Sequence, residues 1–238
     1  KENKYDDDIF FQKYSQMSRS QQGLAGAGEW ETLRKLLPDF KDKRVLDLGC
    51  GYGWHCIYAM EHGASSVVGV DISHKMLEVA KEKTHFPQVE YKCCAIEDVE
   101  FPEESFDVIL SSLAFHYVAD YEILVKKIYR ILKSGGKLVF TVEHPVFTAY
   151  GTQDWYYNEK GEILHFPVDN YYYEGKRTAV FLGEKVTKFH RTLTTYLNTL
   201  LSNGFIINHI VEPQPPENMM DIPGMRDEMR RPMMLIVS

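Results

Sequence analysis

Short apolar runs alternate with amphipathic stretches through the middle of the chain. The stretches between these runs have helical spacing, at 54–62, at 74–83 with Ser73 as N-cap, and from Asp120 to Gly135-Gly136. The runs have the length and composition of buried strands and lie at 44–48, 67–70, 90–93, 106–112 and 137–142. This β–α alternation predicts an α/β fold with a doubly wound, mostly parallel sheet. Two further strands, at 205–211 and 233–237, bring the expected sheet to seven.

Two segments lie outside the alternation. Residues 9–37 predict two helices, 9–17 and 29–37, within an N-terminal leader that covers about 1–40. From 145 to 189 the pattern fails, and this stretch holds 11 of the 31 aromatic residues. We interpret 145–189 as a cap insertion in a single domain whose core is 41–144 and 190–238. The runs Trp155-Tyr-Tyr157 and Tyr171-Tyr-Tyr173 form either the insertion's own core or a surface for the substrate.

The first strand ends in a glycine turn, Gly49-Cys-Gly51-Tyr-Gly53, followed by a helix. Such a turn lets a ligand approach the backbone closely and meet unpaired N–H groups. A dinucleotide fingerprint requires G-x-G-x-x-G, and Trp54 stands where its last glycine belongs, which disfavours a nicotinamide enzyme. Asp47 before the turn suits a ligand with a cationic end. Asp71, at the tip of the second strand, is placed to accept both hydroxyls of a ribose.

Four motifs in order resemble those of class I S-adenosylmethionine-dependent methyltransferases. They are VLDLGCGYG, VVGVDIS, AIEDVEFPEESFDVILSSLAFHYV and ILKSGGKLVFTVEHP, within residues 44–145. The sequence is similar to the small-molecule branch that includes the quinone-biosynthesis methyltransferases. The resemblance implies a Rossmann-like methyltransferase fold, S-adenosylmethionine as cofactor, S-adenosylhomocysteine as product, and a small-molecule acceptor methylated at an O, N or C atom.

The resemblance also implies a set of cofactor-binding residues. Asp47, Gly49 and Gly51 would hold the methionyl part, Asp71 the ribose, and Ile72, Ile96 and Glu97 the adenine. Many relatives carry Asp where this chain has Ala95, so Glu97 is the substitute carboxylate. Ser112 and Leu113 would border the sulfonium, and Tyr14 and Arg19 of the leader would close over the cofactor carboxylate. Tyr117 and Trp155 are the candidate substrate contacts.

Histidines at the ends of the fourth and fifth strands are the candidate general bases. His116 and His144 follow these strands at the carboxyl edge, where doubly wound sheets bind ligands. His190 is a helix-entry residue beside Arg191. A histidine in any of these positions is more often structural than catalytic, and an acceptor that is already a neutral amine needs no base.

Composition and charge narrow the class of protein. The chain has 238 residues, 44% of them hydrophobic, and a net charge of −7. We expect a soluble cytoplasmic enzyme with no membrane span and no nucleic-acid surface, because phosphate binding needs clustered Lys and Arg. The four cysteines have no metal-ligand spacing, so no metal is expected. A non-catalytic S-adenosylmethionine-binding sensor or regulatory subunit is the alternative, and the oligomeric state stays open.

Overall fold

The computed structural model describes residue 1 and residues 3–238. Its main feature is a seven-stranded sheet in the order β10-β11-β5-β4-β1-β2-β3. The strands are β1 (Arg44–Leu48), β2 (Ser66–Asp71), β3 (Val89–Cys93), β4 (Phe106–Ser112), β5 (Leu132–Glu143), β10 (Ile210–Val211) and β11 (Met234–Val237). The strands β3, β2, β1, β4 and β5 are parallel, whereas β11 is antiparallel to β5 and β10 is antiparallel to β11. The predicted doubly wound, mostly parallel fold is confirmed.

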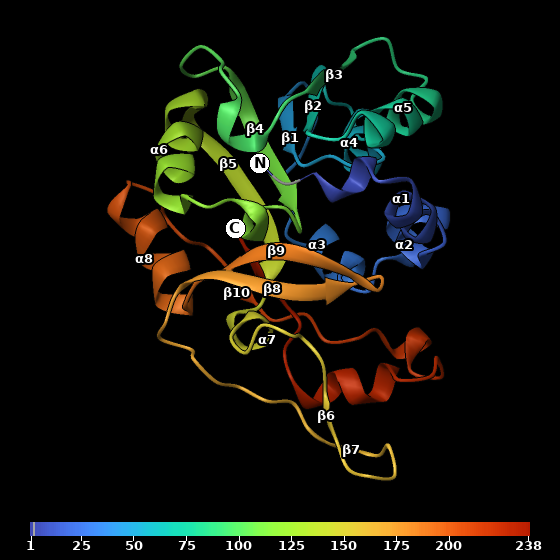
Figure 1. The fold of residues 1–238 in the computed structure, drawn as a ribbon. Helices are drawn as coiled ribbons and strands as arrows, with labels where there is room; N and C mark the ends of the chain where they lie inside the picture. The colour runs from blue at the N-terminus through green and yellow to red at the C-terminus, as the bar shows by residue number, and fades with distance from the viewer. Residues whose placement is uncertain (2) are drawn as a thin grey trace.

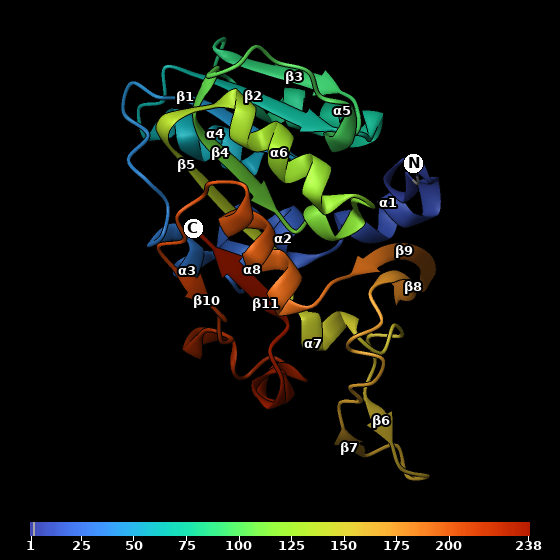
Figure 2. The ribbon, with the colours of Figure 1, turned by 90° about the vertical axis from the view of Figure 1, so that its left-hand side faces the viewer.

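Helices cover both faces of this sheet (Figure 1). α6 and α8 lie on one face, which Figure 2 turns toward the viewer, and α3, α4 and α5 lie on the other. Their bounds are α3 (Trp30–Arg34), α4 (Trp54–Glu61), α5 (His74–Lys83), α6 (Tyr121–Ile131) and α8 (Leu193–Ser202). The side chains of Ser73 and Asp120 cap α5 and α6, as predicted, by accepting from the N–H groups of Met76 and Ile123.

Two helix predictions need correction. The helix expected to run to Gly135-Gly136 ends at Ile131, because Leu132 has extended backbone and already pairs with Phe106 of β4. The leader helix expected at 29–37 covers only Trp30–Arg34. The remaining leader elements are η1 (Lys4–Asp6), α1 (Asp8–Ser15), α2 (Ser18–Gln21) and η2 (Gly23–Gly26).

The cap contains structure that the sequence pattern did not reveal. It comprises α7 (Pro145–Thr148), the short pair β6 (Tyr156–Tyr157) and β7 (Ile163–His165), and the hairpin β8 (Gly175–Phe181) and β9 (Glu184–His190). The hairpin lies across the carboxyl ends of β4 and β5, and β6 and β7 project away from the body of the molecule (Figures 1 and 2).

Short 3-10 helices complete the described chain. They are η3 (Ile96–Asp98), η4 (Phe115–Tyr117), η5 (Glu217–Met219) and η6 (Met225–Arg230). Within residues 1 and 3–238, none of the helices has the length and apolar character that a membrane crossing requires.

Candidate cofactor and acceptor site

The glycine turn joins β1 to α4 at the carboxyl edge of the sheet. Gly49 and Gly51 have φ angles of +81° and +52°, in the left-handed region that favours glycine. A Cβ on Gly49 would lie 2.4 Å from the Cβ of Ala114, whereas a Cβ on Gly51 would meet no atom of the described residues within 4 Å. The backbone at Gly51 therefore faces open space, and a ligand can approach it closely.

The N–H groups of this turn bond within the protein. Gly49 and Cys50 both donate to the carbonyl oxygen of Val70, at 2.8 and 2.9 Å. Gly51 donates to Oδ2 of Asp71 at 2.8 Å. The expectation that the turn offers unpaired N–H groups is wrong for these three residues, because the parallel neighbour β2 supplies their acceptors. What the turn offers a ligand is close approach and an oriented Asp71.

Asp71 is fixed by two backbone donors. Oδ1 accepts from the N–H of Ser73 at 2.9 Å, and Oδ2 accepts from Gly51. A carboxylate oxygen can accept two hydrogen bonds, so each oxygen keeps one acceptor position. Burial raises the pKa of Asp71 above its ordinary value, against the lowering effect of these donors.

Asp47 lies beneath the turn, with an exposed fraction of 1%. Its Oδ2 accepts from Sγ of Cys56 at 3.5 Å, and its Oδ1 has no partner among the described residues. Burial raises the pKa of Asp47 to about 7. This carboxyl group is therefore unusually easy to protonate, and it does not line the cavity described next.

A cavity of about 80 Å³ lies between the turn and the leader. Five of the predicted cofactor residues line it: Tyr14, Arg19, Gly49, Gly51 and Ser112. Its volume holds roughly five to eight water-sized groups, which suits one end of a cofactor rather than a whole one. Residues from the leader, β1 and β4 thus meet around one space, although they are far apart in the sequence.

Of the residues predicted to contact adenine, Ile96 lies beside the glycine turn. Ile96 is buried, and its Cδ1 would lie 3.4 Å from a Cβ on Gly49. Ile72 follows Asp71, and its carbonyl accepts from Nδ2 of Asn3 at 3.2 Å. Glu97 lies in η3, and its carbonyl accepts from Nζ of Lys127 at 2.7 Å.

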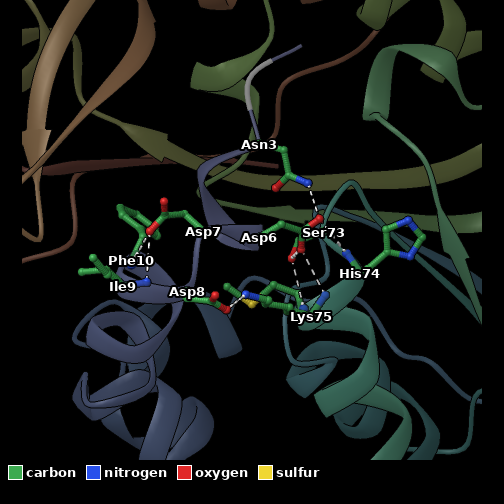
Figure 3. Close-up of polar contacts among 10 residues, drawn as sticks. Asn3, Asp6, Asp7, Asp8, Ile9, Phe10, Ser73, His74 and Lys75 are labelled. Carbon is green, nitrogen blue, oxygen red and sulfur yellow. Dashed lines mark hydrogen bonds and ion pairs between the residues drawn. The ribbon is translucent and has the colours of Figure 1, made fainter.

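The start of the chain docks on this side through Asp6 (Figure 3). Asp6 accepts from Oγ of Ser73 at 2.6 Å and from the N–H of Lys75 at 3.1 Å, at the first turn of α5. Asp8 forms an ion pair with Lys75. These contacts hold the leader next to Asp71, and nothing in the local sequence pattern had indicated them.

Strain marks the carboxyl end of β4. Leu113 has a φ of +54°, which costs a residue with a branched side chain about 1–3 kcal/mol. Its N–H donates to the carbonyl and to Oγ1 of Thr141, at 2.9 and 3.0 Å, and Oγ of Ser112 lies 3.3 Å from the same Oγ1. Bonds to β5 therefore hold Leu113 in this conformation.

The two predicted bases both make structural hydrogen bonds. Nδ1 of His116 accepts from the N–H of Glu143 at 3.3 Å, so a neutral ring carries its proton on Nε2. Burial lowers the pKa of His116 to about 4. His144 caps α7 by accepting from Val146 at Nδ1, 3.0 Å, and its Nε2 lies 2.9 Å from Oε1 of Glu212.

His190 is equally engaged. Its Nδ1 lies 2.7 Å from Oγ1 of Thr148, and its Nε2 lies 2.8 Å from the carbonyl oxygen of Tyr171. Both ring nitrogens hold the cap in place, in agreement with a structural role.

A buried charge cluster that sequence reasoning missed joins the cap to the sheet. Lys188 of β9 forms an ion pair with Glu143 at the end of β5, and Gln153 bonds to both, at 2.6 Å from Glu143 and 2.8 Å from Lys188. The side chains of Lys188 and Glu143 are 3% and 13% exposed. A lone lysine in a strand gives no sequence signal, because its partner lies 45 residues away.

Trp155 lies in a different part of the cap. Its ring packs at 83° to that of Phe166, with the guanidinium of Arg231 5.0 Å from the Trp155 ring centre.

A larger open hollow, of about 900 Å³, lies at the amino end of β5, between Lys133 and Ser238. None of the predicted site residues lines this hollow.

Comparison with known proteins identifies the family. A methyltransferase-domain model matches residues 46–140. A solved structure from Listeria monocytogenes, assigned to the S-adenosylmethionine-dependent methyltransferases, is 57% identical, with a TM-score of 0.87 over 90% of this chain and 97% of that one. The S-adenosylmethionine-dependent methyltransferase of Mesorhizobium loti is 40% identical, with a TM-score of 0.83 over 90% and 98% of the two chains. The chain belongs to the class I S-adenosylmethionine-dependent methyltransferases.

The methyltransferase is also similar to curated relatives over a shorter stretch. The ubiquinone biosynthesis O-methyltransferase of Coxiella burnetii is 36% identical over 112 residues, which are 46% of this chain and 47% of that protein. The chain thus spans about half the length of this relative, and the acceptor does not transfer with the match.

The site of the methyltransferase fits S-adenosylmethionine, its cofactor. The space above Gly51 accepts a ligand that a Cβ would obstruct, and Asp71 keeps acceptor positions beside it. Below them, Oδ1 of Asp47 is buried without a hydrogen-bond partner among the described residues. Asp71 thus offers carboxylate acceptors for the hydroxyl groups of the ligand.

Proposed function

We propose that the methyltransferase transfers the methyl group of S-adenosylmethionine to a small-molecule acceptor by in-line displacement. The observation that carries the proposal is the double anchoring of Asp71 by Gly51 and Ser73, at the end of β2 and beside the open space over the turn. This arrangement presents a fixed carboxylate to a pair of hydroxyl groups, as a ribose requires. The solved relatives of at least 40% identity support the same donor.

Each part of the cofactor has residues to hold it in this proposal. Asp71 holds the ribose, and Ile72, Ile96 and Glu97 flank the adenine. Gly49, Gly51, Ser112 and Leu113 lie along the methionyl part, with Asp47 beneath it and Tyr14 and Arg19 over its end. When bound, S-adenosylmethionine supplies an electrophilic methyl on a sulfonium that leaves as S-adenosylhomocysteine.

The leader and η4 supply an aromatic wall that excludes water from the acceptor side. The hydroxyl oxygens of Tyr5 and Tyr117 lie 3.3 Å apart, and the ring of Tyr5 packs edge-on against that of Tyr14 at 5.3 Å. Tyr14 in turn packs against Tyr52 at 5.8 Å. Aromatic faces attract a cationic sulfonium, and a dry site lets the chain orient the acceptor in line with the methyl group.

The proposal assigns no base to the reaction. Nδ1 of His144 caps α7 and its Nε2 lies 2.9 Å from Oε1 of Glu212, while Nδ1 of His116 accepts from Glu143 and burial lowers the pKa of that ring to about 4. Their roles as bases stay predictions. A small-molecule acceptor is supported by the cap, which covers the carboxyl ends of β4 and β5 (Figure 1).

Calorimetric titration tests the donor, and product release tests the acceptor class. S-adenosylmethionine should bind, and Asp71→Ala should weaken it more than tenfold, because two charge-assisted hydrogen bonds are lost. Release of S-adenosylhomocysteine is then measured against a panel of phenols, amines and carbon acids. Asp221→Ala, at a fully exposed carboxylate, is the matched control and should bind like the wild type.

Three outcomes would contradict the proposal. Binding of a nicotinamide dinucleotide alone would exclude the donor. Unchanged affinity in Asp71→Ala would exclude the ribose assignment. Methyl transfer to a macromolecule with none to any small molecule would exclude the acceptor class.

A further inference from the structure

The buried charges where the cap meets the sheet do not balance. Lys188 and Arg191 are 2% and 5% exposed, and the carboxylate of Glu143 pairs with Lys188. Arg191 donates to the carbonyl oxygens of Phe115 and Ala119, at 3.4 and 3.0 Å, and no carboxylate of the described residues lies within ion-pair distance of it. Two buried cations therefore share one buried carboxylate.

Both cations act on His116. Burial lowers the pKa of His116 to about 4 against the raising effect of Glu143, and the charges of Lys188 and Arg191 lower this pKa as well. Because Nδ1 accepts from the N–H of Glu143, the neutral ring carries its proton on Nε2. His116 thus adds a hydrogen-bond donor to this region and no negative charge.

Two further carboxylates contact residues next to this cluster, but both are exposed. Oε1 of Glu174 accepts from the N–H and the hydroxyl of Thr192, each at 2.8 Å. Oε1 of Glu212, whose side chain is 58% exposed, lies 2.9 Å from Nε2 of His144. Water and salt screen exposed charges, so neither carboxylate compensates the buried charge of Arg191.

The ammonium group of Lys188 keeps one donor for a ligand. It has three N–H groups, and among the described residues two are used, by Oε1 of Glu143 at 2.5 Å and by Oε1 of Gln153 at 2.8 Å. Gln153 has a φ of +60°, a conformation that residues other than glycine rarely adopt. Nζ lies 5.4 and 5.9 Å from the ring centres of Phe181 and Tyr117. The ammonium is thus held in place beside aromatic rings.

Glu143 lies just beyond the residues proposed to border the sulfonium. Alternate side chains of a strand point to the same face, so Thr141 and Glu143 share one face of β5. Oγ1 of Thr141 accepts from the N–H of Leu113 at 3.0 Å and lies 3.3 Å from Oγ of Ser112. The cluster therefore borders the acceptor side of the site, about 7 Å along the strand from Thr141.

The charge that would balance this region is negative. A buried charge without a counter-charge is costly, and a ligand that supplies the counter-charge recovers part of this cost. We propose that the enzyme selects acceptors that carry an anionic oxygen, either a carboxylate or an ionised hydroxyl, and that Lys188 is the specificity-determining residue that binds it. Glu143 and Gln153 are positioning residues that orient the ammonium. The inference rests on the proposed function, which places the sulfonium beside Ser112 and Leu113.

Titration of the enzyme saturated with S-adenosylhomocysteine separates charge from shape. Benzoate and benzamide have nearly the same shape and differ in charge, and 4-nitrophenolate and 4-nitroanisole make the same comparison for an ionised hydroxyl. The wild type should bind one of the two anions at least tenfold more tightly than its neutral counterpart. A preference for benzoate identifies a carboxylate, and a preference for 4-nitrophenolate identifies an ionised hydroxyl.

Two variants should shift this affinity ratio in opposite directions. Lys188→Gln should lower it toward one, because the charged donor is lost. Glu143→Gln should raise it, because the carboxylate no longer neutralises Lys188. A ratio of two dissociation constants does not depend on the fraction of folded enzyme, so a folding defect does not produce these shifts. Lys185→Gln, on the exposed side of β9, and Glu184→Gln, at the pair with Lys13, are the matched controls and should leave the ratio unchanged.

The outcomes separate this inference from the proposed function. Wild-type ratios near one for both pairs of probes, or no binding of any of the four probes, would overturn the inference and leave the donor assignment intact. Shifts in the same direction in Lys188→Gln and Glu143→Gln would also overturn it, because a purely structural ion pair affects both ligands alike. Failure of the wild type to bind S-adenosylhomocysteine would overturn the proposed function itself. Opposite shifts in the two variants would establish Lys188 as the selective residue.

Discussion

The cofactor half and the cap of this enzyme are held together by different means. In the cofactor half, neighbouring parallel strands supply the bonds: Gly49 and Cys50 donate to Val70, and Gly51 donates to Asp71. In the cap, β6 and β7 project from the molecule, and the ion pair of Lys188 with Glu143 ties β9 to the sheet.

The comparison shows which contacts specify the structure of each region. The cofactor half is built from contacts between consecutive β–α units, so a short stretch of sequence specifies most of it. The cap depends on contacts between distant residues, such as that of Lys13 in the leader, which donates to the carbonyl of Leu182 at 3.0 Å. Removing one such contact should therefore lower the free energy of unfolding more in the cap than removing one contact within a β–α unit.

The largest effect should come from Lys188→Met. This change leaves the buried carboxylate of Glu143 without its ion-pair partner, and breaking a buried pair costs about 3–5 kcal/mol of unfolding free energy. Denaturant unfolding measures it. Lys185→Met, on the exposed side of the same strand, should change stability by less than about 0.5 kcal/mol. Equal effects of the two changes would contradict the view that this pair anchors the cap.

In the cofactor half, Asp47→Asn should change the free energy of unfolding by an intermediate amount, and this change should depend on pH. The folded-state pKa of Asp47 is raised to about 7, above its unfolded value, so its contribution to stability is complete at low pH and is lost as pH rises through about 7. The wild type should therefore lose up to about 4 kcal/mol between pH 4 and pH 8 through this group, a loss that Asp47→Asn lacks.

Denaturant unfolding of Asp47→Asn and of the wild type across this pH range measures the difference. Asp221→Asn, at an exposed carboxylate, is its control and should follow the wild type. If the unfolding free energies of the wild type and Asp47→Asn changed in parallel with pH, the raised pKa of Asp47 would be contradicted.

The smallest effects should come from the tyrosine run of the cap. Tyr172 and Tyr173 are 87% and 76% exposed, so Tyr172→Ser and Tyr173→Ser should change the unfolding free energy by less than about 0.5 kcal/mol. The hydroxyl of Tyr171 accepts from the N–H of Leu193 at 3.1 Å, so Tyr171→Phe should cost about 1 kcal/mol. Thermal unfolding of the three variants measures these losses of stability. Equal losses in all three would contradict the distinction between Tyr171, which is hydrogen-bonded, and its two exposed neighbours.

The sequence predicted the cofactor half in detail for a physical reason. Strand–turn–helix units are local, and their signals lie within about ten residues, as at Val45–Gly53 and at the caps Ser73 and Asp120. The helix ending at Ile131 was predicted too long, because pairing of Leu132 with Phe106 is a long-range contact that overrides the local helical pattern.

The cap hairpin was missed because its turn has an uncommon sequence. Leu182 and Gly183 have φ angles of +54° and +79°, as a two-residue hairpin turn requires, but leucine is rare there and Asn or Asp is the usual signal. Beside the site, the contacts of Asp6 with Ser73 and Lys75 were missed because the partners lie 67 and 69 residues apart, which no local sequence pattern reveals.

The docking of Asp6 on α5 has a consequence for the timing of catalysis. A ligand that enters or leaves beside Asp71 past the leader would first have to displace the bonds of Asp6 to Ser73 and Lys75, and that of Asn3 to Ile72. These bonds would then slow the exchange of the ligand although they make no contact with it. The residence time of the ligand would therefore change separately from its affinity. On this route a spent cofactor would wait for Asn3 and Asp6 to release before the next turnover begins.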